Sequence, residues 1–180
     1  MTALDSVLRR HSHAVVSDDA PSHEQLLPLV AAAVTVADHA DLTPFRLLEL
    51  RGVARERVGT AFVEASGLAG AEAARLAAKP LRAPLLIAVV VSFRESMKVP
   101  RWEQEASAAG VAHILSLLLD EAGWGVMWRT GGLVRHEAVA RAHELGDDEQ
   151  LLGWLYVGGR LETGKPAKGE ADGASFLTAL

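Results

Sequence analysis

The spacing of apolar and polar residues predicts a chain that begins with helices and then alternates strands with helices. Leu4, Val7 and Leu8 fall on one face of a short helix over residues 3–10. A second helix is expected over Ser22–Val36, where the Ser-x-x-Gln spacing at its start is that of a capping box. This second helix is apolar on most faces, so it should be buried or lie in a subunit interface.

The strongest strand pattern is Leu85–Phe93, a β-branched run that is apolar on both sides and therefore suits a central strand. The other elements expected are strands over Phe45–Arg51, Trp124–Thr130 and Leu151–Val157, and helices over Val53–Ala65, from the Gly67–Gly70 break to about Lys79, over Trp102–Ala122 and over Val134–Leu145. The longest helix joins two strands, as in a crossover connection. This order predicts an α+β fold in which helices flank a mixed or antiparallel sheet. Residues 1–180 form one expected domain, with about 160–180 as an extended arm.

Composition narrows the class of protein. The 180 residues are 49% hydrophobic and 23% charged, as in soluble globular proteins. The net charge is −5 and no basic block occurs, so duplex nucleic acid is not an expected partner. The chain has no cysteine, which excludes thiolate catalysis and disulfides and fits a cytoplasmic location. Its apolar runs are shorter than the ~20 residues of a spanning helix, so no membrane partner is expected.

Familiar catalytic motifs do not occur. The sequence contains no dinucleotide fingerprint, P-loop, G-x-S-x-G or H-E-x-x-H motif. A metal site could be drawn from His11 and His13, or from His39 with Asp38 and Asp41. Exposed loop histidines are the better interpretation, because no full ligand set has helical spacing. We therefore predict no metal and assign no catalytic acid, base or nucleophile.

Three segments carry candidate binding chemistry. In Arg10-His11-Ser12, a guanidinium and a hydroxyl two residues apart can bind one phosphate, although a solvated basic cluster is the alternative. The Trp128–Gly132 segment ends a strand, where glycines expose backbone N–H groups and Arg129 adds a charge, although an ordinary turn would look similar. Lys98–Glu105 places Trp102 at a helix start, where a surface anchor with a buried indole is the alternative.

Together these segments resemble the flavin-dependent nitroreductase family, in particular its short branch. Arg10-His11-Ser12 lies where that family has an Arg-x-Ser phosphate motif, and Trp128–Gly131 resembles its Trp-Arg-Ser-Gly turn. The Lys98–Glu105 match runs over eight consecutive residues and is the most specific. The remaining similar segments are Ala37-Asp38-His39 with Pro44-Phe45, Arg82-Ala83-Pro84, Gly125, and Gly153–Gly158. The resemblance spans nearly the whole chain.

The resemblance implies an intertwined homodimer with two FMN sites at the interface, with NAD(P)H as co-substrate. It also implies a small-molecule electron acceptor such as a nitroaromatic or a quinone. Arg10 and Ser12 would hold the phosphate and ribityl oxygens. The full set of implied cofactor-binding residues is Arg10, His11, Ser12, Trp128, Arg129, Thr130 and Gly131 of one protomer, with Thr35, His39 and Thr43 of its partner.

The sequence departs from that branch at several of these positions. His11 and Thr35 stand where arginine is usual, Thr43 replaces glutamine, Ala37 replaces proline and Phe45 replaces tryptophan. The loss of two arginines predicts a weaker hold on phosphate, unless Arg9 or Arg129 compensates. Two functions therefore remain open: an FMN-dependent NAD(P)H oxidoreductase, or a non-catalytic flavin-binding homodimer that serves storage, sensing or scaffolding. A helical adaptor without flavin has little support.

Overall fold

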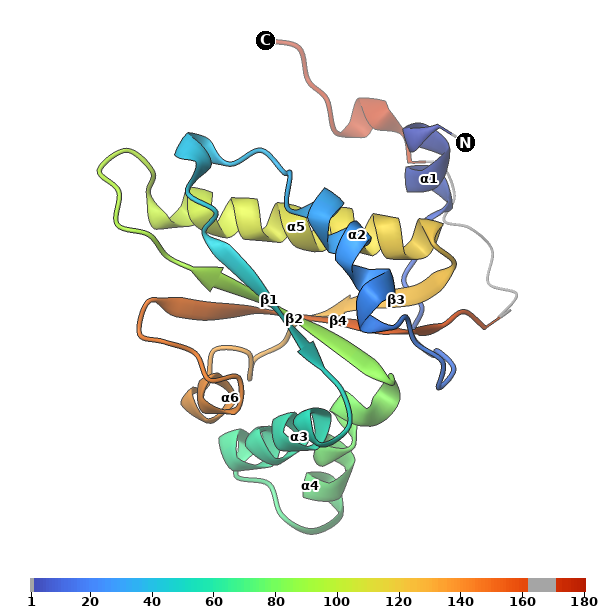
Figure 1. The fold of residues 1–180 in the computed structure, drawn as a ribbon, viewed down its shortest axis with the longest axis vertical. Helices are drawn as coiled ribbons and strands as arrows, with labels where there is room; N and C mark the ends of the chain where they lie inside the picture. The colour runs from blue at the N-terminus through green and yellow to red at the C-terminus, as the bar shows by residue number, and fades with distance from the viewer. Residues whose placement is uncertain (1, 162–170) are drawn as a thin grey trace.

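The computed structural model describes residues 2–161 and 171–180, and places a four-stranded sheet between two layers of helices (Figure 1). The strands are β1 (Phe45–Leu50), β2 (Leu85–Ser92), β3 (Trp124–Arg129) and β4 (Glu149–Gly159). The helices are α1 (Ala3–Arg9), α2 (His23–Ala33), α3 (Val53–Ser66), α4 (Gly70–Ala77), α5 (Arg101–Glu121) and α6 (Glu137–Ala142). Three short 3₁₀ helices are η1 (His39–Asp41), η2 (Lys79–Arg82) and η3 (Gly173–Ser175).

Strand β2 is the centre of the fold, as its sequence predicts. All eight of its residues are buried, and alternate side chains enter opposite layers. Leu85, Ile87 and Val89 join the core under α2 and α5, whereas Leu86 and Val90 join the core over α3 and α6. Each large aliphatic side chain buried in this way contributes roughly 1.5–3 kcal/mol.

The strand order is β1-β2-β4-β3, and every neighbouring pair is antiparallel. The α+β expectation is confirmed, and of the two sheet types expected, the antiparallel one is found. Helix α5 does connect β2 to β3, but β4 lies between these two strands. The crossover therefore joins strands that run in the same direction without pairing.

Helices α5 and α2 cover one face of the sheet (Figure 1). In α5, buried residues recur at the helical period and include Val111, Leu115 and Leu119. In α2, only Leu26 and Ala33 are fully buried. The outer side of this pair of helices is apolar and exposed. The burial predicted for α2 is therefore found only on the side that faces the sheet.

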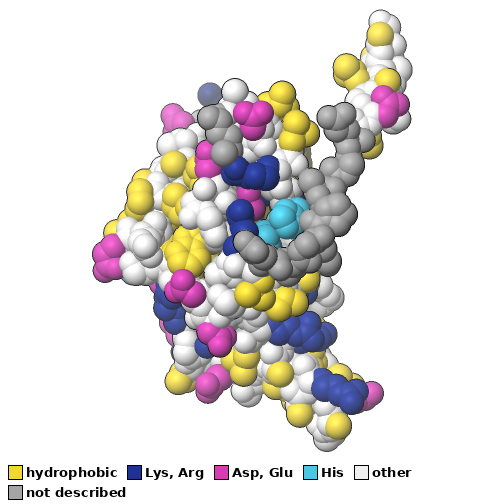
Figure 2. Space-filling model, turned by 90° about the vertical axis from the view of Figure 1, so that its right-hand side faces the viewer, with side chains coloured by type: hydrophobic (Ala, Val, Ile, Leu, Met, Phe, Trp, Pro, Cys, Tyr) yellow, Lys and Arg dark blue, Asp and Glu magenta, His cyan; other side chains and the backbone are white. Residues whose placement is uncertain are grey.

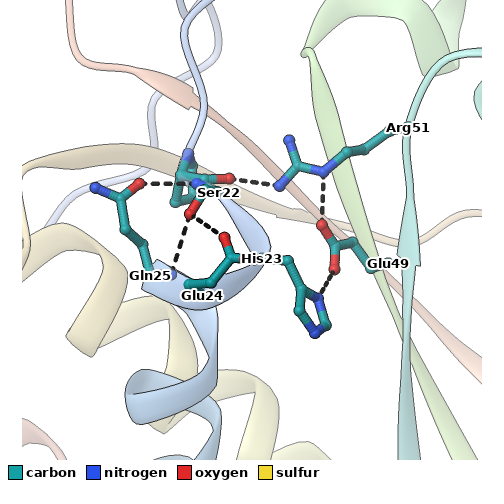
Figure 3. A network of polar contacts seen from close by, with 7 residues as sticks. Ser22, His23, Glu24, Gln25, Glu49 and Arg51 are labelled. Atoms are coloured by element: carbon teal, nitrogen blue, oxygen red, sulfur yellow. Dashed lines mark hydrogen bonds and ion pairs between the residues drawn. The ribbon is translucent and has the colours of Figure 1, made fainter.

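The start of α2 is fixed by a polar network (Figure 3). Ser22 and Gln25 form the predicted capping box, in which each side chain accepts from the other residue's backbone N–H. Arg51, just after β1, donates to the backbone carbonyl of Pro21 and to Glu49, and Glu49 contacts His23 at 2.7 Å. The network ties the first turn of α2 to the end of β1.

Three elements differ clearly in length from the sequence expectation, and the first is α2, which was expected to run to Val36 and ends at Ala33. Helix α6 covers only part of the predicted Val134–Leu145, because turns follow Gly131 and the helix begins after its N-cap His136. Strand β4 extends beyond the predicted Leu151–Val157 at both ends. The added residues at its start pair with β2, and those at its end pair with β3.

A buried histidine joins α6 to the sheet. Nδ1 of His143 donates to the carbonyl of Val139 at 2.7 Å, and its Nε2 accepts from Nε1 of Trp154 at 2.8 Å. The indole N–H can only donate, so His143 is neutral with its proton on Nδ1. Burial lowers the pKa of His143 below its ordinary value of 6.5.

This histidine should make the fold sensitive to acid. Below pH 6.5 the unfolded chain takes up a proton at His143 that the folded protein does not. The free energy of unfolding should therefore fall, by up to about 1.4 kcal/mol per pH unit, until the folded protein also binds the proton. Urea unfolding between pH 7 and pH 5 measures this slope. His143→Gln keeps a donor and an acceptor and should reduce the slope, whereas an unchanged slope would contradict the assignment. Part of the slope should remain, because burial also lowers the pKa of His13.

The two ends of the chain present apolar side chains outward. Helix α1 forms as predicted, but Leu4, Val7 and Leu8 are all more than half exposed. Of the predicted arm, residues 162–170 lie outside the described part, and Phe176 and Leu177 beyond them are exposed. No helix in residues 2–161 and 171–180 is both long and apolar enough to cross a bilayer.

Candidate functional site

The segment Arg10–Ser12 follows α1 and runs toward the edge strand β3. The backbone N–H of His13 donates to the carbonyl of Val126, and Nη2 of Arg129 donates to the carbonyl of Ala14 at 3.3 Å. Figure 2 faces this side of the molecule, where histidine side chains (cyan) lie beside Lys and Arg side chains (dark blue). The structure thus ties Arg129 to the main chain two residues after the first predicted phosphate motif.

A cavity of about 450 Å³ opens beside the end of β3, and we name it the β3 cavity. Four predicted site residues line it: Trp128, Arg129, Thr130 and Gly131. Other lining residues include Phe62, Lys79, Arg82, Trp154 and Tyr156. Its volume is within the range of small-molecule and cofactor sites.

The charge of the β3 cavity is positive. Lys79, Arg82 and Arg129 line it, and none of its described lining residues is acidic. The Arg129 guanidinium lies 5.1 Å from the centre of the Tyr156 ring. Burial raises the pKa of Tyr156 to about 12, against the opposing effect of Arg129 and Arg82, so its phenol stays protonated. The cavity therefore favours an anionic or electron-rich aromatic ligand.

Sequence reasoning did not single out Lys79 as a site residue, and it used Arg82 only as part of a similar segment. Both belong to η2, the short turn that leads into β2. Two cations on either side of Pro80 just before a buried strand are a weak signal in themselves. Their importance comes from the fold, which places them at the same cavity as Arg129.

Trp128 points away from Arg129 and packs on α5. Its ring meets His113 edge-on, with 5.0 Å between ring centroids. Its buried Nε1 has no hydrogen-bond partner among the described residues, and the same holds for Nε of Arg129. Gly153 of β4 makes room for this arrangement, because a Cβ there would lie 2.9 Å from Nε1 of Trp128. Two unpaired buried donors on neighbouring residues are the kind of group that a bound ligand satisfies.

The residues assigned to the partner protomer lie elsewhere. Thr35 and His39 line an open groove between α2 and α5, which we name the α2–α5 groove and which has a volume of about 820 Å³. His113 and Ile114 of α5 form its other wall. Within one protomer, Thr35 and His39 therefore line a different hollow from the β3 cavity, whereas His113 links the two by its contact with Trp128.

The loop that carries His39 and Thr43 has an unusual backbone. Ala40, Asp41 and Thr43 all have positive φ angles, of 65°, 51° and 46°. Asp38 stabilises this shape, since its Oδ2 accepts from the backbone N–H of Thr43 at 2.6 Å. Residues held in such conformations cost free energy and cluster at functional sites. Within the described residues, no group of three or more acidic or histidine side chains could hold a metal ion.

The Lys98–Glu105 segment shapes the neighbouring loops. Gln104 is buried, and its side chain accepts from the N–H of Arg94 and donates to the carbonyls of Arg94 and Val99. Glu103 contacts Nδ1 of His39 at 2.8 Å and so orients that ring. Trp102 is 68% exposed, so the alternative with a buried indole is wrong.

Comparisons with known proteins bear on the family and the fold of this chain. The sequence profile described as "Nitroreductase family" matches residues 7–159. The chain belongs to the nitroreductase family. A relative from Escherichia coli (strain K12), named "Putative NAD(P)H nitroreductase YdjA", is 33% identical over 163 residues that cover 88% of each chain. The family therefore supports an oxidoreductase role.

Solved structures of the family have the same fold. A nitroreductase-like protein from Bacillus cereus superposes with a TM-score of 0.86 over 100% of this chain and 96% of that chain, at 20% identity. The FMN and NADPH-dependent nitroreductase NfnB from Sphigopyxis sp. strain HMH has a TM-score of 0.76 over 100% and 99% of the two chains, at 16% identity. At these identities the likeness establishes the fold alone.

Proposed function

We propose that this protein is an FMN-dependent NAD(P)H oxidoreductase that works as a homodimer. The observation that carries the proposal is the β3 cavity, which three cations line and where Arg129 also donates to the carbonyl of Ala14, two residues after the segment Arg10–Ser12. Its lining is aromatic as well as positive, which suits a planar ring that gains negative charge when it is reduced. NfnB, which shares the fold, is described as FMN and NADPH-dependent.

The residues present fit FMN. Arg10 and Ser12 would hold its phosphate, with His11 beside them, and the Trp128–Gly131 segment would hold its ring system. Arg129, whose Nε has no partner among the described residues, supplies guanidinium donors at the cavity. Backbone at Gly131, with a φ of 149°, is exposed at the cavity and lets a ligand approach closely.

When bound, FMN supplies the hydride chemistry, from NAD(P)H to an acceptor such as a nitroaromatic or a quinone. The chain's contribution is binding and electrostatics. Lys79, Arg82 and Arg129 place positive charge at the cavity, which favours the more negative, reduced cofactor. No protein nucleophile is required, in line with the sequence motifs.

Apolar side chains that stay exposed in one protomer support the homodimer. Leu27 of α2, Val34 just after α2 and Ile114 of α5 are exposed on the outer layer. A second copy would cover this apolar surface, and symmetry would bring its Thr35, His39 and Thr43 to the flavin. Since Glu103 already pairs with His39, Arg10 is the expected main cation for the phosphate, whereas Arg129 lies in the segment proposed to hold the ring system.

An absorbance spectrum tests the proposed function. Protein from a flavin-sufficient host should be yellow, NAD(P)H should bleach the flavin band, and an added quinone should restore it. Bound flavin that NAD(P)H does not bleach would instead favour the non-catalytic flavin-binding homodimer. Protein that binds no FMN at all would contradict both functions.

The phosphate assignment predicts a specific loss. Arg10→Ala removes a charge-assisted contact and should weaken FMN binding about 10- to 100-fold, because such contacts contribute roughly 1.5–3 kcal/mol. Flavin fluorescence titration measures the dissociation constant. Arg75→Ala in α4 is a matched control that should leave it unchanged. If Arg10→Ala binds FMN as tightly as the parent, the phosphate is held elsewhere.

A further inference from the structure

Asp120, in the last turn of α5, is a buried carboxylate that the proposed function does not use. Its side chain is 1% exposed. Its Oδ1 accepts from Nη2 of Arg160 at 2.9 Å, and its backbone carbonyl accepts from the same nitrogen at 2.6 Å. Burying a carboxylate is costly unless it is paired, so Asp120 must be matched by the groups around it.

Those groups flank the phosphate motif on both sides. Nε of Arg9 lies 4.0 Å from Oδ2 of Asp120, and Nε2 of His13 lies 3.7 Å from Oδ1. Between these two contacts the chain carries Arg10, His11 and Ser12. Arg10 and His11 are half-buried and Ser12 is exposed, so one carboxylate contacts both ends of a three-residue segment whose middle stays accessible.

Other contacts hold the same segment near the sheet. The N–H of Arg10 donates to the carbonyl of Ser6, and the N–H of His13 donates to that of Val126. These bonds fix the main chain at its two ends but not the Arg9 and His13 side chains. Arg160 follows β4, so Asp120 links α5, the N-terminal segment and the end of the sheet.

We propose that Asp120 is a positioning residue that holds Arg10–Ser12 in the geometry that binds the FMN phosphate. The inference rests on the proposed function. Asp120 contacts neither the β3 cavity nor the α2–α5 groove, so its effect must pass through Arg9 and His13. A ligand gains affinity when its site is held in the binding geometry in advance.

The direction in which Asp120→Asn changes FMN affinity distinguishes a positioning role from a direct effect of charge. A carboxylate near a phosphate repels it, so charge alone predicts that Asp120→Asn strengthens FMN binding. Positioning predicts the opposite, because the amide keeps the shape but holds Arg9 and His13 less firmly. Burial lowers the pKa of His13, so it is neutral at pH 7 and adds little charge of its own.

The experiment compares FMN with riboflavin, which has the same ring and no phosphate. Asp120→Asn should weaken FMN binding about tenfold and change riboflavin binding less than twofold, in fluorescence titrations at pH 7. A general loss of structure would weaken both ligands alike. Glu121→Gln is the matched control, since this neighbouring carboxylate is exposed and contacts Ser6 at 3.4 Å. The control should leave both affinities unchanged.

Each outcome decides the matter. FMN binding that is unchanged or tighter in Asp120→Asn, with a parent that binds FMN, overturns the positioning role and leaves the proposed function standing. A parent that binds no FMN overturns the proposed function itself. If Asp120→Asn does not fold, His13→Gln removes one of the two flanking contacts without removing charge at pH 7. That variant should weaken FMN alone by at least threefold, and equal losses for both flavins would overturn the proposal.

Discussion

Replacing Gly153 with alanine is expected to lower the free energy of unfolding by about 3 kcal/mol. Gly153 has a φ of 142°, and its added Cβ would lie 2.5 Å from the carbonyl oxygen of Arg129. The positive φ costs about 1–3 kcal/mol in a residue with a side chain, and overpacking costs about 1–3 kcal/mol more. The clash falls on backbone, which cannot move aside as a flexible side chain can. Urea denaturation followed by circular dichroism measures the change.

Gly132→Ala is the control for this prediction. Gly132 lies in the turn that follows β3, and a Cβ there would meet nothing within 4 Å. Its free energy of unfolding should stay within about 0.5 kcal/mol of the parent. If Gly153→Ala were as stable as Gly132→Ala, the close packing of β3 on β4 at this point would be wrong. The prediction does not depend on flavin.

A second large effect is expected for the assembly. Ile114→Glu places a carboxylate on the outer side of α5, where the proposed homodimer buries an apolar surface. An unpaired charge buried in an interface costs about 3–5 kcal/mol, which is a hundredfold or more in the dissociation constant. A symmetric interface contains the substitution twice. The variant should therefore sediment as a monomer at micromolar concentration, and its FMN affinity should fall with the loss of Thr35 and His39 from the other copy.

Val53→Glu provides the matched control. Val53 is the first residue of α3 in the opposite layer and is 69% exposed, and a carboxylate suits the first turn of a helix. This variant should have the sedimentation coefficient and FMN affinity of the parent. A parent that is already a folded monomer at micromolar concentration would contradict the homodimer, whatever the variants do.

The sequence was most informative where a pattern is local. Strand β2 follows from eight residues whose burial on both faces can be seen in their composition, and the start of α2 follows from the capping spacing of Ser22 and Gln25. Both depend on contacts within one short segment or on one uniform environment. The segment Arg10–Ser12 could be proposed as a phosphate motif for a similar reason, because its residue types stand next to one another, and it stays a prediction.

What the sequence did not reveal depends on contacts between distant segments. Lys79 is an ordinary exposed lysine until η2 folds beside β3, and only then does it share a cavity with Arg129. His113 is one of many positions on the longest helix until Trp128 packs on it. The role proposed for Asp120 likewise depends on its contacts with Arg9 and Arg160, which lie at opposite ends of the chain. Contacts between residues so far apart in the sequence produce no periodic pattern from which they could be predicted.

The position of β4 in the sheet determines when the other strands can pair during translation. β4 is the last strand to leave the ribosome, yet it lies between β2 and β3. Until it emerges, β2 can pair only with β1, and β3 lacks its strand partner among the described residues. Unpaired aliphatic strand edges are templates for aggregation. A nascent chain that stalls before residue 149 thus exposes two such edges, and we expect it to aggregate more readily than a chain in which β4 has paired with both.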